Sequence, residues 1–320
     1  MKSELAVPCM KVSDLKKYYP FKGNTLKALD GVSLEIQPGE IFGIVGESGC
    51  GKSTLGKCMM RIVDITEGQI WFNGKDISTQ KRKAILPELR KMQMIFQNPY
   101  SSFNPKLKIG YSIKEACRVS GKKADEIEEL MERYLGYISL SENELNRFPH
   151  ELSGGQLQRL AIARALMLNP DFIVADEPVS ALDVSVQAQI LNLLLELREK
   201  VNMTMLFISH DMTVVEHLCN STAVMYLGAI VEEGRTNVLF KNIMHPYTKA
   251  LISSIPVIDD NERRERIILT GDIPTAVNIP PGCRFASRCD SCMGICKEVS
   301  PQLKEVEPGH KVACHLYDDK

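Results

Sequence analysis

The sequence has 320 residues, of which 44% are hydrophobic and 25% charged, and its formal net charge is −1. These values are typical of a globular chain with a sizeable core, and the balanced charge gives no reason to expect nonspecific binding to nucleic acid or anionic membranes. No apolar run approaches the roughly 18 residues needed to cross a bilayer, and the N-terminus lacks the apolar core of a secretory signal. We therefore expect a cytosolic protein whose ten cysteines are not paired in structural disulfides.

The first elements expected along the chain are strands. Val32, Leu34 and Ile36 alternate with polar residues, which is the two-residue period of a half-buried strand. The apolar run IFGIVG at 41–46 predicts a buried strand, and the stretch IWFNGKDI at 70–77 contains Asn-Gly, a strong hairpin signal. The N-terminal region therefore combines antiparallel and buried strands.

Residues from about 85 to 165 have the character of a helical subdomain, because Ile127, Leu130 and Tyr134 recur at the spacing of one helix face. After it, FIVAD at 172–176 and MLFIS at 205–209 predict buried strands with an amphipathic helix between them, which implies a parallel sheet with a right-handed crossover. From about 240 the chain is richer in proline and loop residues. We expect an α/β core over residues 1–240 and a C-terminal extension over residues 241–320.

The stretch GESGCGKST at 46–54 follows a predicted strand and opens a predicted helix, which is the context of a phosphate-binding loop. Its glycines allow the backbone N–H groups to approach phosphate oxygens, and the helix N-terminus adds its dipole. Lys52 is expected to reach the β- and γ-phosphates of ATP, and the Ser53 hydroxyl to bind Mg²⁺. The nucleotide-binding residues expected in this loop are Gly46, Glu47, Ser48, Gly49, Cys50, Gly51, Lys52, Ser53 and Thr54.

The run FIVADE at 172–177 supplies the carboxylates that such a site needs. Its apolar strand places Asp176 at the carboxyl end, where the side chain can hold Mg²⁺. Glu177 follows and is expected to act as the general base that polarises the attacking water.

The stretch LSGGQLQR at 152–159 lies between these two motifs and resembles the signature of ATP-binding-cassette (ABC) ATPases. The resemblance implies that Ser153, Gly154, Gly155 and Gln156 close over the ATP held by a second cassette. A helix that opens with these residues presents an N-terminus suited to an anion.

Four further residues match ABC motifs in the expected order. The resemblance implies that Gln97, in MIFQNP, senses the γ-phosphate and binds Mg²⁺, and that His210, in FISHD, is a catalytic switch. The segment 180–183, which ends with Asp183, resembles the loop that joins two cassettes in a dimer. Tyr19 is placed where the family stacks an aromatic ring on adenine, and Tyr18 is the alternative.

The cassette is free-standing, which resembles importer ATPases that dock on separate permease subunits. The segments MIFQNPYSSFNP (94–105), RFPHELSGGQLQRLAIARAL (147–166) and HPYTKAL (245–251) resemble the oligopeptide/dipeptide group, and its F-type ATPase more than its D-type partner. The resemblance implies an ATP-hydrolysing subunit at the cytoplasmic face of the membrane. Its partners would be a D-type ATPase in a heterodimer, two permease subunits and an extracellular solute-binding protein, without nucleic acid. Nickel or oligosaccharides remain alternative cargoes, and a non-transport cassette ATPase acting on a macromolecule remains an alternative function.

The C-terminal extension contains the run CRFASRCDSCMGIC at 283–296. The spacing of Cys283, Cys289, Cys296 and Cys314 resembles the tail of peptide-importer ATPases, in which four cysteines hold a [4Fe–4S] cluster, and four thiolates suit such a cluster. Cys292 adds a C-x₂-C pair that resembles half of a zinc ribbon, so Zn²⁺ is an alternative. Either metal would stabilise a tail that has few large apolar residues.

Overall fold

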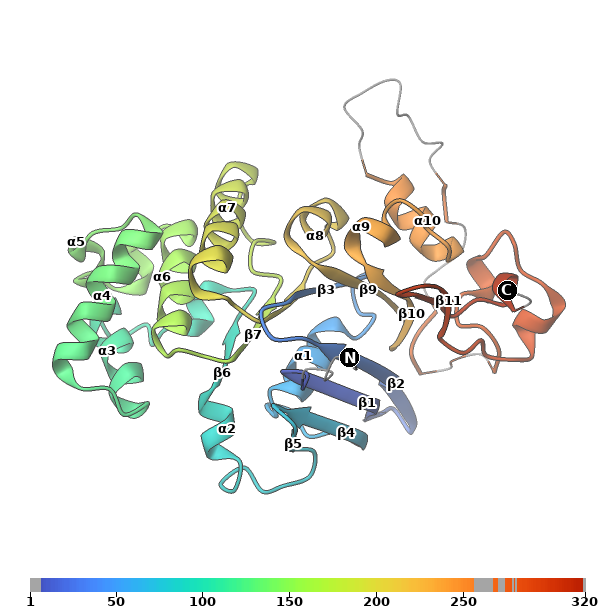
Figure 1. Cartoon of the computed structure of the whole chain (residues 1–320), viewed down its shortest axis with the longest axis horizontal. Coiled ribbons are helices and arrows are strands. Elements are labelled where there is room, and N and C mark those ends of the chain that lie inside the picture. Colours follow the sequence, from blue (N-terminus) through green and yellow to red (C-terminus); the bar gives the residue numbers. More distant parts are fainter. Residues whose placement is uncertain (1–6, 256–266, 270–273, 278, 280, 319–320) are drawn as a thin grey trace, which may run out of the picture.

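A mixed sheet of eight strands forms the centre of the computed structural model, which describes residues 7–255, 267–269, 274–277, 279 and 281–318 (Figure 1). Five neighbouring strands are parallel and three antiparallel strands extend the sheet toward the C-terminal end. All residues of β3 and β7 are buried, as their unbroken apolar runs predict. The strand order is β11 (Lys304–Glu307), β12 (His310–Val312), β10 (Ala229–Arg235), β9 (Ser221–Tyr226), β3 (Ile41–Val45), β8 (Met205–Ile208), β7 (Phe172–Asp176) and β6 (Met92–Ile95).

A second, antiparallel sheet covers one side of this core. Val32, Leu34 and Ile36 are buried while the residues between them are exposed, so the predicted strand is confirmed. The Asn73-Gly74 turn joins two paired strands, which confirms the hairpin. The helix α1 (Lys52–Met59) packs between the two sheets. The order in the second sheet is β2 (Asn24–Ile36), β1 (Met10–Phe21), β4 (Glu67–Phe72) and β5 (Lys75–Asp76).

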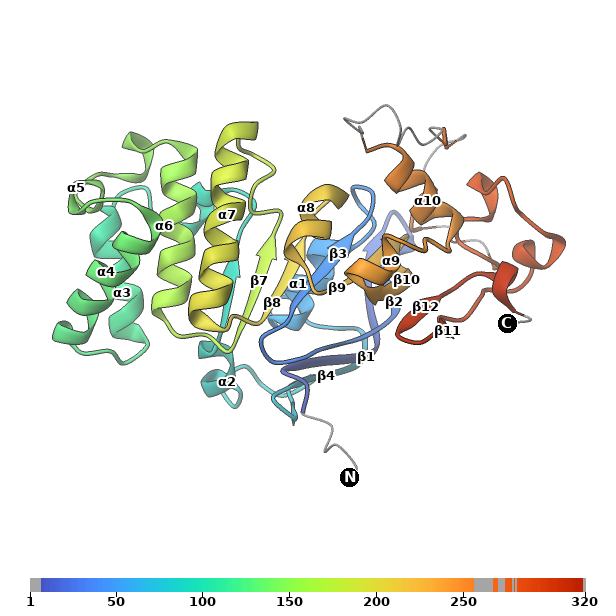
Figure 2. The same cartoon turned by 45° about the horizontal axis from the view of Figure 1, so that its top comes forward.

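Helices gather at the end of the central sheet beyond β6 (Figure 1). In α4 the buried residues include Ile127, Leu130 and Tyr134, which confirms the predicted amphipathic face. Figure 2 shows α6 and α7 side by side, the second being the helix that connects β7 to β8. The range 85–165 also contains β6, so a strand of the main sheet lies within the segment expected to be helical. The elements are α2 (Leu86–Arg90), η1 (Pro99–Ser102), α3 (Ile109–Val119), α4 (Ala124–Ile138), α5 (Glu142–Leu145), η2 (Pro149–Glu151), α6 (Gly154–Met167) and α7 (Val184–Val201).

The C-terminal extension joins the core through its own strands. Glu232 of β10 pairs in register with Val312 of β12, so the main sheet continues into the extension. The Glu232 carboxylate lies 2.9 Å from the ring of His310, and both side chains are completely buried. It also accepts the backbone N–H groups of Met244 and His245. The remaining elements are α8 (Met212–Leu218), α9 (Thr236–Leu239), α10 (Pro246–Ser253), η4 (Ala286–Arg288), η5 (Gly294–Lys297) and η6 (His315–Tyr317).

No helix within the described part of the chain combines the length and the apolar character that a membrane span requires.

Candidate site of ATP binding and hydrolysis

The phosphate loop connects the buried strand β3 to the helix α1. Gly51 precedes the helix with φ of 109°, and a Cβ there would lie 2.3 Å from the carbonyl oxygen of Ala28. Gly46 has φ of 151°, and a Cβ there would lie 2.2 Å from the carbonyl oxygen of Met225. Both positions therefore require glycine, because a side chain would collide with rigid backbone.

Lys52 and Ser53 are the first two residues of α1, at the end of this loop. Lys52 is 4% exposed, and its Nζ donates to the carbonyl oxygens of Gly46 at 2.7 Å and Glu47 at 3.0 Å. The Ser53 hydroxyl donates to the Asp176 carboxylate at 2.7 Å. Burial raises the pKa of Asp176, while the hydrogen bond from Ser53 acts in the opposite direction. The Ser53 hydroxyl oxygen and the Asp176 carboxylate oxygen therefore lie close together, and Mg²⁺ prefers oxygen ligands of this kind.

Glu177 is the centre of a polar group at the carboxyl ends of β6, β7 and β8. Its φ is +47°, a backbone conformation that non-glycine residues rarely adopt and that is frequent at functional sites. One carboxylate oxygen accepts from Gln97 Nε2 at 3.1 Å and lies 3.5 Å from His210 Nδ1. Gln97 also donates to the Ser180 hydroxyl at 3.2 Å. The structure therefore brings together three of the predicted catalytic residues, Gln97, Glu177 and His210, while the fourth, Lys52, lies in the phosphate loop.

The signature residues 153–156 cap helix α6. The Ser153 hydroxyl accepts the N–H of Gln156 at 3.2 Å, and the Gln156 side chain accepts the N–H of Ser153 at 3.1 Å, which is a capping box. A Cβ on Gly155 would lie 2.5 Å from the side chain of Val186, so the glycine allows α6 to approach α7 closely. These residues belong to the helical end of the molecule, whereas the phosphate loop lies at the end of β3 (Figures 1 and 2).

Asp183 has a capping role of the same kind. It precedes α7, and its carboxylate accepts the N–H of Val186 at 3.0 Å and the hydroxyl of Ser185 at 2.7 Å. The hydrogen bond from Ser185 lowers the pKa of Asp183. The last residue of the segment 180–183 is therefore held in place by its hydrogen bonds to the first turn of α7.

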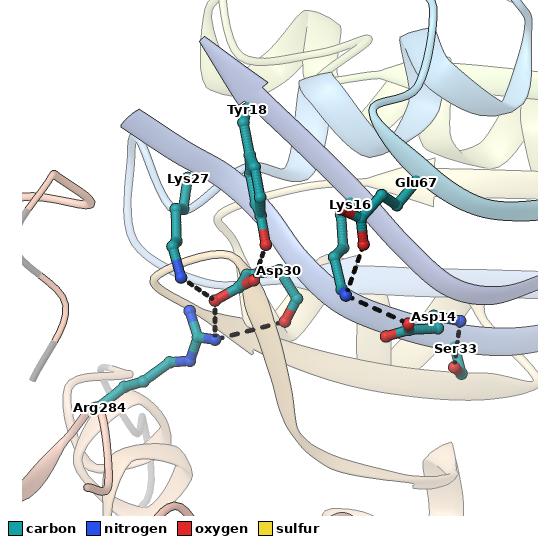
Figure 3. Close-up of polar contacts among 8 residues, drawn as sticks. All are labelled: Asp14, Lys16, Tyr18, Lys27, Asp30, Ser33, Glu67 and Arg284. Atoms are coloured by element: carbon teal, nitrogen blue, oxygen red, sulfur yellow. Dashed lines mark hydrogen bonds and ion pairs between the residues drawn. The ribbon is translucent and has the colours of Figure 1, made fainter. Parts of the chain in front are cut away.

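Tyr18 and Tyr19 are neighbours in β1, so their side chains leave the strand on opposite faces. The Tyr18 hydroxyl donates to Asp30, and Figure 3 shows this contact on the face that receives the C-terminal extension. Burial and the nearby thiol of Cys58, a residue of α1, raise the pKa of Tyr19. Since Asp30 occupies the Tyr18 hydroxyl on one face of the strand, Tyr19 on the opposite face remains the expected adenine-stacking residue.

The C-terminal extension contributes side chains to the phosphate loop that the sequence reasoning did not predict. The Glu47 carboxylate forms two hydrogen bonds with Arg288, and the Glu47 N–H donates to the Tyr247 hydroxyl at 2.8 Å. These residues are separated from the loop by about two hundred positions or more, so no local pattern indicates the contacts.

The cysteines of the extension lie close to one another. The Cys283 N–H donates to the Cys296 carbonyl oxygen at 2.7 Å. Burial, together with the nearby thiols of Cys296, Cys314 and Cys289, raises the pKa of Cys283 to about 11. Across the described residues, no three histidine, cysteine, aspartate or glutamate side chains are arranged to hold a single metal ion.

The phosphate loop, the Asp-Glu pair at the end of β7 and the capped signature helix define an ATPase of the ABC cassette class. The ABC transporter family matches residues 29–180, and the family described as oligopeptide/dipeptide transporter, C-terminal region, matches residues 231–296. This chain belongs to the ATP-binding proteins of ABC transporters, in the group that carries this C-terminal region. The family, its ATP-hydrolysing activity and the cassette fold expected from the sequence are therefore confirmed.

Relatives of nearly equal length support the assignment. The oligopeptide transport ATP-binding protein AppF of Bacillus subtilis is 47% identical over 96% of this chain and 97% of its own length. The dipeptide transport ATP-binding protein DppF of Escherichia coli is 44% identical over 98% of this chain and 96% of its own length. A dimeric structure of the ATP-binding cassette MJ0796, bound to ADP and Pi, is 28% identical and superposes with a TM-score of 0.64, covering 71% of this chain and 98% of the other.

Proposed function

We propose that this protein hydrolyses ATP to drive the import of peptides through a separate membrane permease. The observation that carries the proposal is the polar group around Glu177, assembled next to a phosphate loop that the C-terminal extension contacts directly. The match to the oligopeptide/dipeptide C-terminal region and the names of the relatives support peptide as the cargo.

The contacts give each residue a role in hydrolysis. Lys52 would donate to the terminal phosphates of ATP, and Ser53 and Asp176 would hold Mg²⁺. Bound Mg²⁺ supplies positive charge against the phosphate oxygens. Glu177 would orient and deprotonate the attacking water, and Gln97 and His210 would fix its carboxylate.

A second cassette would complete the site. Ser153, Gly154, Gly155 and Gln156 lie at the N-terminus of α6, away from the phosphate loop of their own chain, so they are placed to close over ATP held by another subunit. The dimeric structure of MJ0796 supports this arrangement. We propose a D-type ATPase as the partner, two permease subunits, an extracellular solute-binding protein and a position at the cytoplasmic membrane face.

The test of cargo and partners is uptake together with co-purification. We expect the full-length chain to co-purify with integral permease subunits, and cells that lack it to lose uptake of labelled di- and oligopeptides. Reintroducing the Glu177→Gln variant should not restore uptake. Loss of nickel or oligosaccharide uptake with normal peptide uptake would contradict peptide as the cargo. Association with ribosomes or DNA in place of a permease would contradict transport altogether.

We also propose that Cys283, Cys289, Cys296 and Cys314 hold a [4Fe–4S] cluster. Burial and neighbouring thiols of this set raise the pKa values of Cys283, Cys289 and Cys314, and the Cys283 N–H donates to the Cys296 carbonyl oxygen at 2.7 Å. Thiolates gathered in this way repel one another unless a cationic centre offsets their charge. A structural Zn²⁺ site would need four such side chains grouped around one ion, and the described residues contain no group of three or more. Cys283, Cys289, Cys296 and Cys314 would hold a four-iron cluster, for which four cysteine thiolates are the usual ligand set.

Metal analysis of protein purified without oxygen tests this proposal. We expect iron and acid-labile sulfide in equal amounts, about four of each per chain. Cys289→Ser should lose both, and the matched variant Cys292→Ser should retain them. Zinc without iron or sulfide, or loss of iron only in Cys292→Ser, would contradict the proposed ligand set.

A further inference from the structure

A buried ion pair joins residues 283–296, the cysteine-bearing segment, to the phosphate loop at 46–54. Arg288 lies in η4, directly before Cys289, and its two terminal nitrogens donate to the two Glu47 carboxylate oxygens at 2.8 and 3.0 Å. The side chains of Arg288 and Glu47 are 6% and 20% exposed. Paired, charge-assisted hydrogen bonds of this geometry are among the strongest polar contacts in proteins. The loop residue is therefore fixed by a side chain 241 positions away.

The remaining polar groups of Glu47 are also occupied. Its N–H donates to the Tyr247 hydroxyl at 2.8 Å, and its carbonyl oxygen accepts from Lys52 Nζ at 3.0 Å. Tyr247 is completely buried, with its ring centroid 4.6 Å from that of Tyr226 and 5.4 Å from that of Phe285. Because Phe285 also belongs to the cysteine-bearing segment, this aromatic cluster joins that segment to α10 and β9. The contacts from Arg288 and Tyr247 thus tie Glu47 to the C-terminal extension, while Lys52 and the Cys50 N–H hold its carbonyl oxygen within the loop.

We propose that Arg288 and Tyr247 are positioning residues of the ATP site. They hold Glu47, the second residue of the loop, in the conformation from which the loop receives phosphate. The neighbouring glycines at 46, 49 and 51 have positive φ and give the free loop many conformations. A loop held before binding loses less entropy when nucleotide enters, so the contacts lower the cost of binding. The C-terminal extension is therefore part of the nucleotide site and acts on affinity.

A second arginine of the same segment provides a matched comparison (Figure 3). Arg284 donates to the Asp30 carboxylate at 2.8 Å, and these side chains are 14% and 15% exposed. The pair anchors the segment on Asp30 of β2, and the side chains of Tyr18 and Lys27 also donate to the Asp30 carboxylate. Removing Arg284 therefore tests loss of anchoring, and removing Arg288 tests loss of the contact with the loop.

The experiment measures Mg-ADP binding to the full-length protein by calorimetry, because ADP occupies the loop without being hydrolysed. We expect Arg288→Ala to weaken binding about 10-fold, equal to about 1.4 kcal/mol, and Arg284→Ala to change it less than about 2-fold. Arg288→Lys should recover part of the affinity, because lysine keeps the charge but loses the paired geometry. At saturating ATP, the turnover of Arg288→Ala should stay close to that of the parent protein.

A double variant separates positioning from general damage. Glu47→Gln with Arg288→Gln leaves no unpaired charge buried, so it should fold as the parent does, as judged by its unfolding midpoint. Its loss of ADP affinity should be no larger than that of either single variant, because the two residues act through one contact. Additive losses, equal losses in Arg284→Ala and Arg288→Ala, or unchanged ADP affinity in folded Arg288→Ala would each overturn the proposal.

Discussion

Replacing Glu177 by glutamine is expected to stop ATP turnover while ATP still binds. Glutamine preserves the size of the side chain and can still contact Gln97 and His210, which lie 3.1 and 3.5 Å from the carboxylate. It cannot accept a proton from water, so the rate of hydrolysis should fall by roughly 10²- to 10⁴-fold. The measurement is phosphate release at saturating ATP, together with the dissociation constant for Mg-ATP, which should stay close to that of the parent protein.

The control for this variant is Glu196→Gln. Glu196 is an exposed residue of α7, and its ion pair with Lys200 lies at the surface. This change also removes one carboxylate, but it should leave the rate unaltered because the pair is far from the end of β7. Hydrolysis by Glu177→Gln at the rate of the control would remove Glu177 from the role of general base.

Replacing Lys52 by alanine is expected to weaken the binding of nucleotide strongly. Its ammonium is buried and lies within the loop, between the carbonyl oxygens of Gly46 and Glu47. Losing one member of a buried charge-assisted contact costs 2 kcal/mol or more, so Mg-ATP binding should weaken at least about 30-fold. The measurement is the dissociation constant by calorimetry, which should rise for both ADP and ATP. If the β-phosphate is the main contact of Lys52, the rise should be the same for the two nucleotides.

Lys91→Ala is a suitable comparison for the lysine variant. Lys91 pairs with Asp171 at the surface, 3.2 Å apart, outside the phosphate loop. Its loss should change neither binding nor turnover measurably, because exposed ion pairs contribute little. If Lys52→Ala bound nucleotide as Lys91→Ala does, the loop at 46–54 would not be the phosphate site.

Much of the core could be predicted from local patterns. The unbroken apolar runs of β3 and β7 are typical of strands buried on both faces, and the periodicity of α4 indicates one buried face. Carboxyl ends of adjacent parallel strands meet at one edge, so Gln97, Glu177 and His210 could be expected to converge. The strands and the helix face were predicted because they depend on neighbours in sequence, and the convergence of the three side chains follows from a simple rule of sheet geometry.

The contacts of the extension could not be predicted in the same way. The pairing of Arg288 with Glu47 depends on how two segments far apart in the chain pack together, and no periodicity records it. The short strands β11 and β12 have few apolar residues, so their pairing with the core sheet was also missed. The choice between Tyr18 and Tyr19 needed the register of β1, which the sequence does not fix.

The pairing of β12 with β10 has a consequence for the order of folding. Ribosomes deliver the N-terminal part of a chain first, so β3, β7, β8 and β9 can assemble before β12 exists. Until then the outer edge of β10 has open backbone groups, and Glu232 lacks its partner His310. Open edges of this kind invite pairing with other chains. The nascent cassette therefore has an aggregation-prone edge from the time β10 is made until β12 emerges, and one of the last segments to emerge is the one that protects it.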